Sequence, residues 1–124
     1  MDKIEIKAQK LLLVEGNDDK GVFEKLIEEI GVDDIQVHSM GGKDNFRTPD
    51  LKSIIIAPGF REVKSLGIVR DADENADDTF SSICTVLREC GLPVPSQPMG
   101  IISASLKVGA LVIPPGATRG EIED

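Results

Sequence analysis

Two short apolar runs that end abruptly in acidic residues constrain the fold of this chain most. Leu11 to Val14 leads directly into Glu15, and Leu66 to Val69 leads through Arg70 into Asp71. Continuous apolar runs of this length are typical of strands buried on both faces of a parallel sheet. In open sheets of that kind, ligands bind outside the carboxyl ends of the strands. The sequence therefore predicts an acidic site at the carboxyl edge of a parallel sheet.

The rest of the chain alternates between strand and helix patterns. The expected strands span 8–14, 35–40 and 66–70, with a fourth from one of the apolar runs 100–105 and 108–113, which could also pair as a hairpin. The expected helices span 18–30 and 77–90, and a third lies within 48–62 and ends at Pro58 and Gly59, although 54–56 is also compatible with a strand. This order predicts an α/β fold of the Rossmann-like kind, with an open, mostly parallel four-stranded sheet and helices on both faces.

The helix at 18–30 has the clearest pattern. Asn17 or Asp18 can cap its start, and Gly31 stands where a helix usually ends in a left-handed residue. Five apolar side chains share one helical stripe, which we expect to face the core. They are Val22, Phe23, Leu26, Ile27 and Ile30.

The composition indicates one α/β domain over residues 1–113 of the 124-residue chain, followed by a turn-rich tail at 114–124 that looks like the start of a truncated element. No apolar stretch approaches the roughly 20 residues that span a bilayer, and no signal-peptide pattern is present. We therefore expect a cytoplasmic protein with no membrane partner. Cys84 and Cys90 are six residues apart on one expected helix, so we expect two unpaired core residues instead of a disulfide.

The net charge of −8 argues against tight binding to a nucleic-acid backbone without a metal ion. Two neighbouring strands would, however, bring Glu15, Asp71 and Asp73 together, and hard divalent cations bind such oxygen clusters. Three carboxylates about 5 Å apart repel by roughly 3 kcal/mol per pair at an effective dielectric near 20, so the cluster favours a bound cation. Crowding also raises the affinity of a carboxylate for a proton, which would suit Glu15 to acid or base chemistry near neutral pH.

The motif Val14-Glu15-Gly16-x-x-Asp19, together with Asp71-x-Asp73, resembles the Toprim (topoisomerase–primase) domain over residues 8–113. The most similar branches are small stand-alone Toprim-like proteins and the nucleases of the overcoming-lysogenisation-defect (OLD) family. The resemblance implies that Glu15 is a catalytic acid or base and a metal ligand. It also implies that Asp71 and Asp73, with Asp19 as in the nuclease branch, hold Mg²⁺ or Mn²⁺. The implied function is metal-dependent processing of phosphodiester bonds in DNA or RNA, with help from another domain or protein.

Other interpretations remain open from the sequence. The chain could be a non-catalytic Toprim-fold interaction module in a DNA- or RNA-processing complex, or a phosphotransfer receiver. The acidic segments could also be helix caps and solvated loops. Lys43 and Arg47 could contact a phosphate beside the metal or simply solvate a loop, and exposed sheet edges are compatible with a homodimer.

Overall fold

The computed structural model describes residues 4–42, 46–71, 76–96, 101–102 and 106–113, which build a five-stranded sheet in the order β2-β1-β3-β5-β4. Four strands are parallel, and the two-residue β4 pairs antiparallel with β5. The predicted open sheet of four parallel strands is therefore confirmed, with a short antiparallel strand added at one edge. The strands are β1 (Lys10–Val14), β2 (Ile35–Ser39), β3 (Ser65–Asp71), β4 (Ile101–Ile102) and β5 (Lys107–Ile113).

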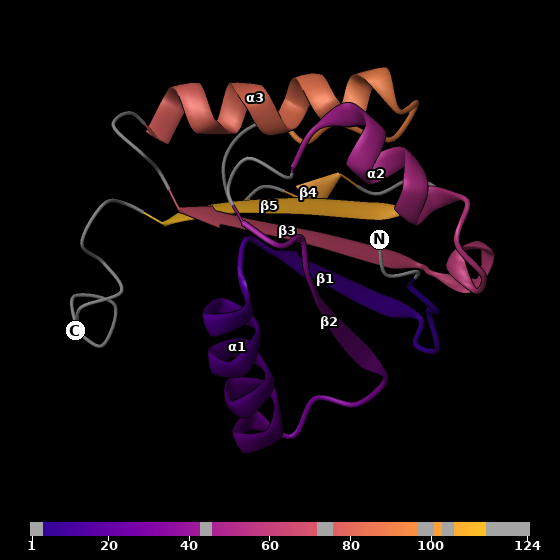
Figure 1. Cartoon of the computed structure of the whole chain (residues 1–124), viewed down its shortest axis with the longest axis vertical. Helices are drawn as coiled ribbons and strands as arrows, with labels where there is room; N and C mark the ends of the chain where they lie inside the picture. The colour runs from indigo at the N-terminus through magenta and orange to yellow at the C-terminus, as the bar shows by residue number, and fades with distance from the viewer. Residues whose placement is uncertain (1–3, 43–45, 72–75, 97–100, 103–105, 114–124) are drawn as a thin grey trace.

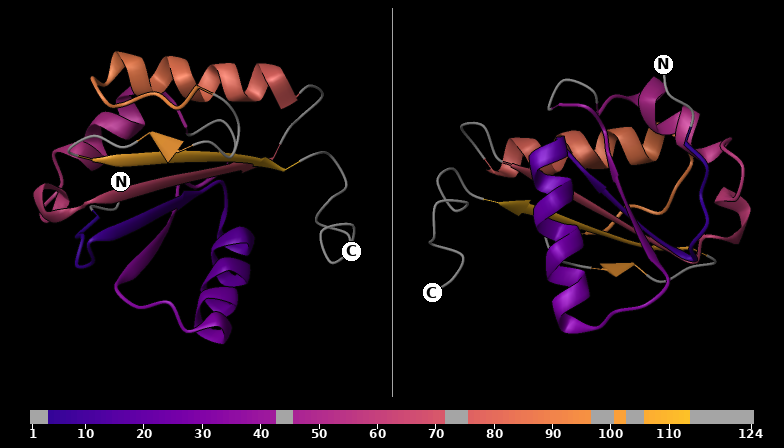
Figure 2. Two further views of the ribbon diagram at one scale, coloured as in Figure 1. Left: turned by 180° about the vertical axis from the view of Figure 1, so that it is seen from behind. Right: turned by 60° about the horizontal axis from the view of Figure 1, so that its bottom comes forward.

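Helices lie on both faces of this sheet, as predicted. Helix α1 (Asn17–Ile30) covers one face, whereas α2 (Thr48–Ile55) and α3 (Ala76–Glu89) lie on the other (Figures 1 and 2). The segment 48–62 contains α2 and a 3-10 helix, η2 (Phe60–Glu62), on either side of the break predicted at Pro58 and Gly59. Pro58 lies in the connection, and a proline cannot continue an α-helix.

The larger core lies between the sheet and the pair α2 and α3. Leu11 and Leu13 of β1 point into it, as do Leu66 and Ile68 of β3. Each of these side chains is at most 2% exposed. This face holds the sheet together because alternate residues of β1, β3 and β5 supply aliphatic side chains to one continuous cluster.

The face under α1 holds a smaller core. Helix α1 has no buried residue, and it contacts the sheet cluster through the partly buried Phe23 and Ile27. The expectation that the whole apolar stripe faces the core was wrong, because Val22, Leu26 and Ile30 are 65%, 46% and 63% exposed. A single helix packed on a sheet contacts it along a band that is narrower than this stripe. The apolar residues outside that band therefore remain exposed.

Capping of α1 also differs from expectation. Its N-cap is Gly16, and neither Asn17 nor Asp18 occupies that position. The carboxylate of Asp19 accepts the Gly16 N–H at 3.2 Å, which ties the start of the helix to the end of β1. Gly31 ends the helix with a φ of 76°, as the sequence predicts.

Two further expectations concern the whole chain. Within the described ranges, no helix has the length and apolar character needed to cross a membrane. Cys84 and Cys90 are both free thiols, so the prediction that they form no disulfide is confirmed. The tail expected at 114–124 lies outside the described residues.

Candidate functional site

The carboxyl ends of β1 and β3 bring two predicted site residues together. Leu13 pairs with Ile68 in the parallel register of these strands, so Glu15 and Asp71 both leave the sheet at this edge. The backbone N–H of Asp71 donates a hydrogen bond to Oε2 of Glu15, with a donor–acceptor distance of 2.5 Å. A carboxylate delivered by one strand is thus fixed by the backbone of its neighbour.

Arg70 supplies a positive charge at the same carboxylate. Its Nε lies 3.9 Å from Oε2 of Glu15, and each of the two side chains is 11% exposed. The guanidinium also lies over the ring of Phe46, 5.7 Å from the ring centroid, within the range of a cation–π contact. From the sequence, Arg70 could either pair with Asp71 or guide a substrate, and Phe46 had no predicted role. The alternation of side chains along a strand could have indicated the position of Arg70. This side chain must point to the opposite face from Asp71, which is the face of the larger core.

Burial and like charges govern the electrostatics of Glu15. Desolvation by burial is the largest effect and raises the pKa of Glu15 above its ordinary value. The Asp71 N–H and the Arg70 guanidinium lower the pKa, whereas repulsion from the carboxylates of Asp71 and Asp19 raises it. Two of the other predicted carboxylates, those of Asp71 and Asp19, therefore act on Glu15 through space.

Asp19 also has a structural role in this arrangement. Its carboxylate accepts the Gly16 N–H, so it serves as a cap for α1 while it faces the same edge of the sheet. The loop after β2 is also held next to Glu15, because the Gly42 N–H donates to the backbone carbonyl of Glu15 at 2.7 Å. Gly41 and Gly42 both have positive φ, 91° and 132°, which explains why glycines occupy this turn.

Of the other predicted site residues, the structure describes Arg47 alone. The Arg47 guanidinium pairs with the Asp50 carboxylate at 3.3 Å on α2, and its side chain is 69% exposed. Asp73 and Lys43 lie outside the described residues. Over the described ranges, no group of three or more His, Cys, Asp or Glu side chains is arranged to hold a metal ion.

His38, the chain's one histidine, is in β2, paired with Leu13 of β1. Its pKa is lowered by burial first and by the ammonium of Lys20 second. Both effects disfavour a positive charge on this imidazole.

One family model matches the chain over residues 9–124, and its description is "Protein of unknown function (DUF3226)". The match spans most of the sequence, so the chain belongs to this family. Neither a curated protein nor a solved structure matches the chain.

Proposed function

We propose that this member of the DUF3226 family is a Toprim-like, metal-dependent enzyme that processes phosphodiester bonds of DNA or RNA. The observation that carries the proposal is the convergence of Glu15 and Asp71, joined by the Asp71 N–H at the carboxyl edge of two parallel strands. Ligand sites in open α/β sheets lie at this edge. The ion in this proposal is Mg²⁺ or Mn²⁺.

The charge balance of the edge supports a cation. The pKa of Glu15 is raised by burial and by repulsion from Asp71 and Asp19. Without a metal ion, the ionised form of Glu15 is therefore destabilised at this edge. A divalent ion would relieve this repulsion, and carboxylate oxygens are its preferred ligands. The proposal requires a third carboxylate beside Glu15 and Asp71. That role falls to Asp73, or to Asp19 once it leaves the Gly16 N–H.

A divalent ion bound here would supply polarisation of a phosphoryl oxygen. Glu15 is suited to accept or deliver a proton, since burial and the neighbouring acids raise its pKa. Arg70 would hold the Glu15 carboxylate in place while adding positive charge beside the substrate. The net charge of −8 means that a further domain or protein must provide most of the contacts to the nucleic-acid backbone.

The first test is thermal unfolding with and without Mn²⁺ for three proteins: wild type, Asp71→Asn and Asp33→Asn. Asp33 is exposed and lies before β2, at the opposite end of the sheet, so Asp33→Asn is a matched control for the loss of one carboxylate. Saturation at about 100 times Kd adds roughly 2.7 kcal/mol to the folded state, or on the order of 10 °C for a chain of this length. We expect this rise in wild type and Asp33→Asn and its loss in Asp71→Asn.

A rise of equal size in all three proteins, or in none, contradicts the proposed metal site. Cleavage of labelled DNA and RNA oligonucleotides with Mn²⁺ then tests the chemistry, with Glu15→Gln as the inactive variant. If the metal shift is present but cleavage is absent under all conditions, the second candidate holds.

That second candidate is a non-catalytic interaction module of the same fold. Two observations favour it. The Arg70 guanidinium already offsets the charge of Glu15, and the Asp19 carboxylate already caps a helix. In this case Asp71→Asn would leave complex formation with the partner protein unchanged.

A further inference from the structure

Among the described residues, the outer edge of β2 is open. There, β2 is the first strand in the sheet order and pairs with β1 alone. The Lys10 N–H donates to the Asp34 carbonyl, and the Met40 N–H donates to the Val14 carbonyl, so the even-numbered residues of β2 turn their backbone groups towards β1. The alternate residues, Ile35, Val37 and Ser39, therefore turn theirs outward.

Nothing in the described part of the chain covers this edge. The backbone groups of Ile35, Val37 and Ser39 make no hydrogen bond across it within the described ranges. The strand sequence Ile-Gln-Val-His-Ser also contains no proline and no lysine, the residues that commonly protect an edge from pairing. β2 is thus a five-residue template to which another extended segment can add.

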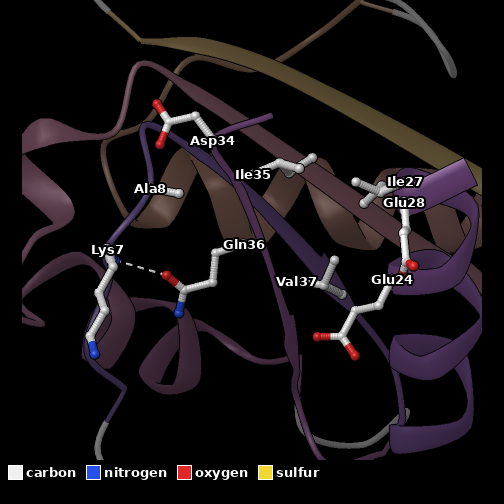
Figure 3. Close-up of a pocket in the computed structure, with 9 residues that line it drawn as sticks. All are labelled: Lys7, Ala8, Glu24, Ile27, Glu28, Asp34, Ile35, Gln36 and Val37. Atoms are coloured by element: carbon white, nitrogen blue, oxygen red, sulfur yellow. Dashed lines mark hydrogen bonds between the residues drawn. The ribbon is translucent and has the colours of Figure 1, made fainter. Parts of the chain in front are cut away.

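A groove runs beside this edge, lined by β2, α1 and the segment before β1 (Figure 3). Its volume is about 490 Å³, enough to hold several side chains. The floor of the groove is apolar, and its rim carries carboxylates from α1 and from the turn before β2. Ala8, Ile27, Ile35 and Val37 supply the apolar lining, and Glu24, Glu28 and Asp34 supply the carboxylates.

The charges of the groove identify the chemistry of its occupant. Lys7 is the one cationic side chain that lines it, and its ammonium is paired with the Glu5 carboxylate at 3.3 Å. Glu24 and Glu28 are one helical turn apart on the same side of α1, so their charges repel and both face the groove. A second copy of the chain would bring the same carboxylates to its own β2, which opposes pairing between two copies.

We propose that β2 and this groove form a docking site for an extended basic segment of a partner protein. The segment adds to β2 as a sixth strand, with its backbone bonded to Ile35, Val37 and Ser39. Its alternate apolar side chains enter the groove between Ile27 and Ile35, and its Lys or Arg side chains meet Glu24 and Glu28. This inference stands apart from the proposed metal site, which lies at the carboxyl ends of β1 and β3.

The probes are fluorescein-labelled synthetic peptides of about six residues, the usual length of a strand, in which Lys or Arg alternates with Val, Ile, Leu or Phe. Binding is measured by fluorescence polarisation to the full chain. Each peptide is compared with a form in which Glu replaces the basic residues, and with a form that is N-methylated at alternate amides and so cannot complete the ladder. We expect binding by basic peptides and its loss in both control forms.

The variant Glu24→Lys, Glu28→Lys reverses two charges of the groove, and Glu29→Lys is a control that reverses one charge on another side of the same helix. All three residues are exposed, so the fold is retained. We expect the double variant to weaken binding about tenfold and Glu29→Lys to change it less than about twofold. Amide hydrogen exchange should slow at Ile35, Val37 and Ser39 when the peptide binds.

Three outcomes overturn the proposal. The first is that no basic peptide of the set binds the chain. The second is that Glu29→Lys weakens binding as much as the groove variant. Binding would then reflect a general attraction of basic peptides to an acidic protein and not a specific site. The third is that the Ile35, Val37 and Ser39 amides are already protected without peptide in a dimer, which would make a second copy the occupant.

Discussion

The contact between Glu15 and Arg70 gives the sharpest quantitative prediction. Nε of Arg70 and Oε2 of Glu15 are 3.9 Å apart, and both side chains are 11% exposed. At an effective dielectric of about 20, two unit charges at this distance attract by about 4 kcal/mol. The cost of removing both groups from water cancels part of this attraction, so we expect a coupling free energy of about 2 kcal/mol.

The assay is a double-mutant cycle on the metal-free protein with wild type, Glu15→Gln, Arg70→Gln and the double variant. Arg70→Gln should destabilise the fold, because it leaves the Glu15 carboxylate buried beside the other acids without this countercharge. The coupling of about 2 kcal/mol corresponds to about 8 °C in Tm for a chain of this length. Urea unfolding in EDTA at low salt gives the four free energies of unfolding.

The pH dependence of Glu15→Gln follows from the raised pKa of Glu15, of which burial is the main cause. A carboxyl group whose pKa is raised by folding contributes stability that is present at low pH and is lost as pH rises through the folded pKa. Glu15→Gln should therefore be more stable than wild type at about pH 7 and lose this advantage at about pH 4, below the ordinary pKa. A coupling below about 0.5 kcal/mol, or a Glu15→Gln variant less stable than wild type at neutral pH, would refute the reasoning.

Three further predictions concern the fold. Because burial lowers the pKa of His38, stability should fall as pH drops from about 7.5 to 5.5, and His38→Gln should lose less over the same range in thermal unfolding. Gly59 has a φ of 93°, and an added Cβ would lie 1.9 Å from the carbonyl oxygen of Ile6, so Gly59→Ala should cost about 3 kcal/mol in urea unfolding. Leu13→Ala should cost about 2–5 kcal/mol, because Leu13 is fully buried, whereas Leu26→Ala on α1 should cost less than about 1 kcal/mol.

The fold was predictable because the apolar runs had both the length and the continuity of buried parallel strands. Leu11 to Val14 and Leu66 to Val69 lie in the two central neighbours β1 and β3, as their patterns indicate. Pattern alone did not show how far α1 is covered, since Val22 and Ile30 have the same helical spacing as the residues that touch the sheet. Exposure of a stripe depends on what else packs against it, and that is a property of tertiary structure.

The site was predictable for a related reason. Residues that follow parallel strands must meet at one edge, and this placed Glu15 near Asp71 before any contact was known. The sequence could not reveal that the Asp71 backbone would bond to Glu15, nor that Arg70 would turn back over Phe46. Those contacts depend on the register of β1 against β3 and on a loop from a different part of the chain.

The two proposals solve one physical problem at different places. If the chain acts on a polyanion, as proposed, its net charge of −8 requires positive charge from outside, and its surface offers two places to receive it. Glu15 and Asp71 present acids at the carboxyl edge of β1 and β3, whereas Glu24 and Glu28 present acids along the open edge of β2. A cation at the first place leaves the second free for a basic partner, so both can be filled in one complex. The Mn²⁺ response should therefore persist when the groove charges are reversed, and peptide binding should persist in Asp71→Asn. Loss of either would show that the two sites are not independent.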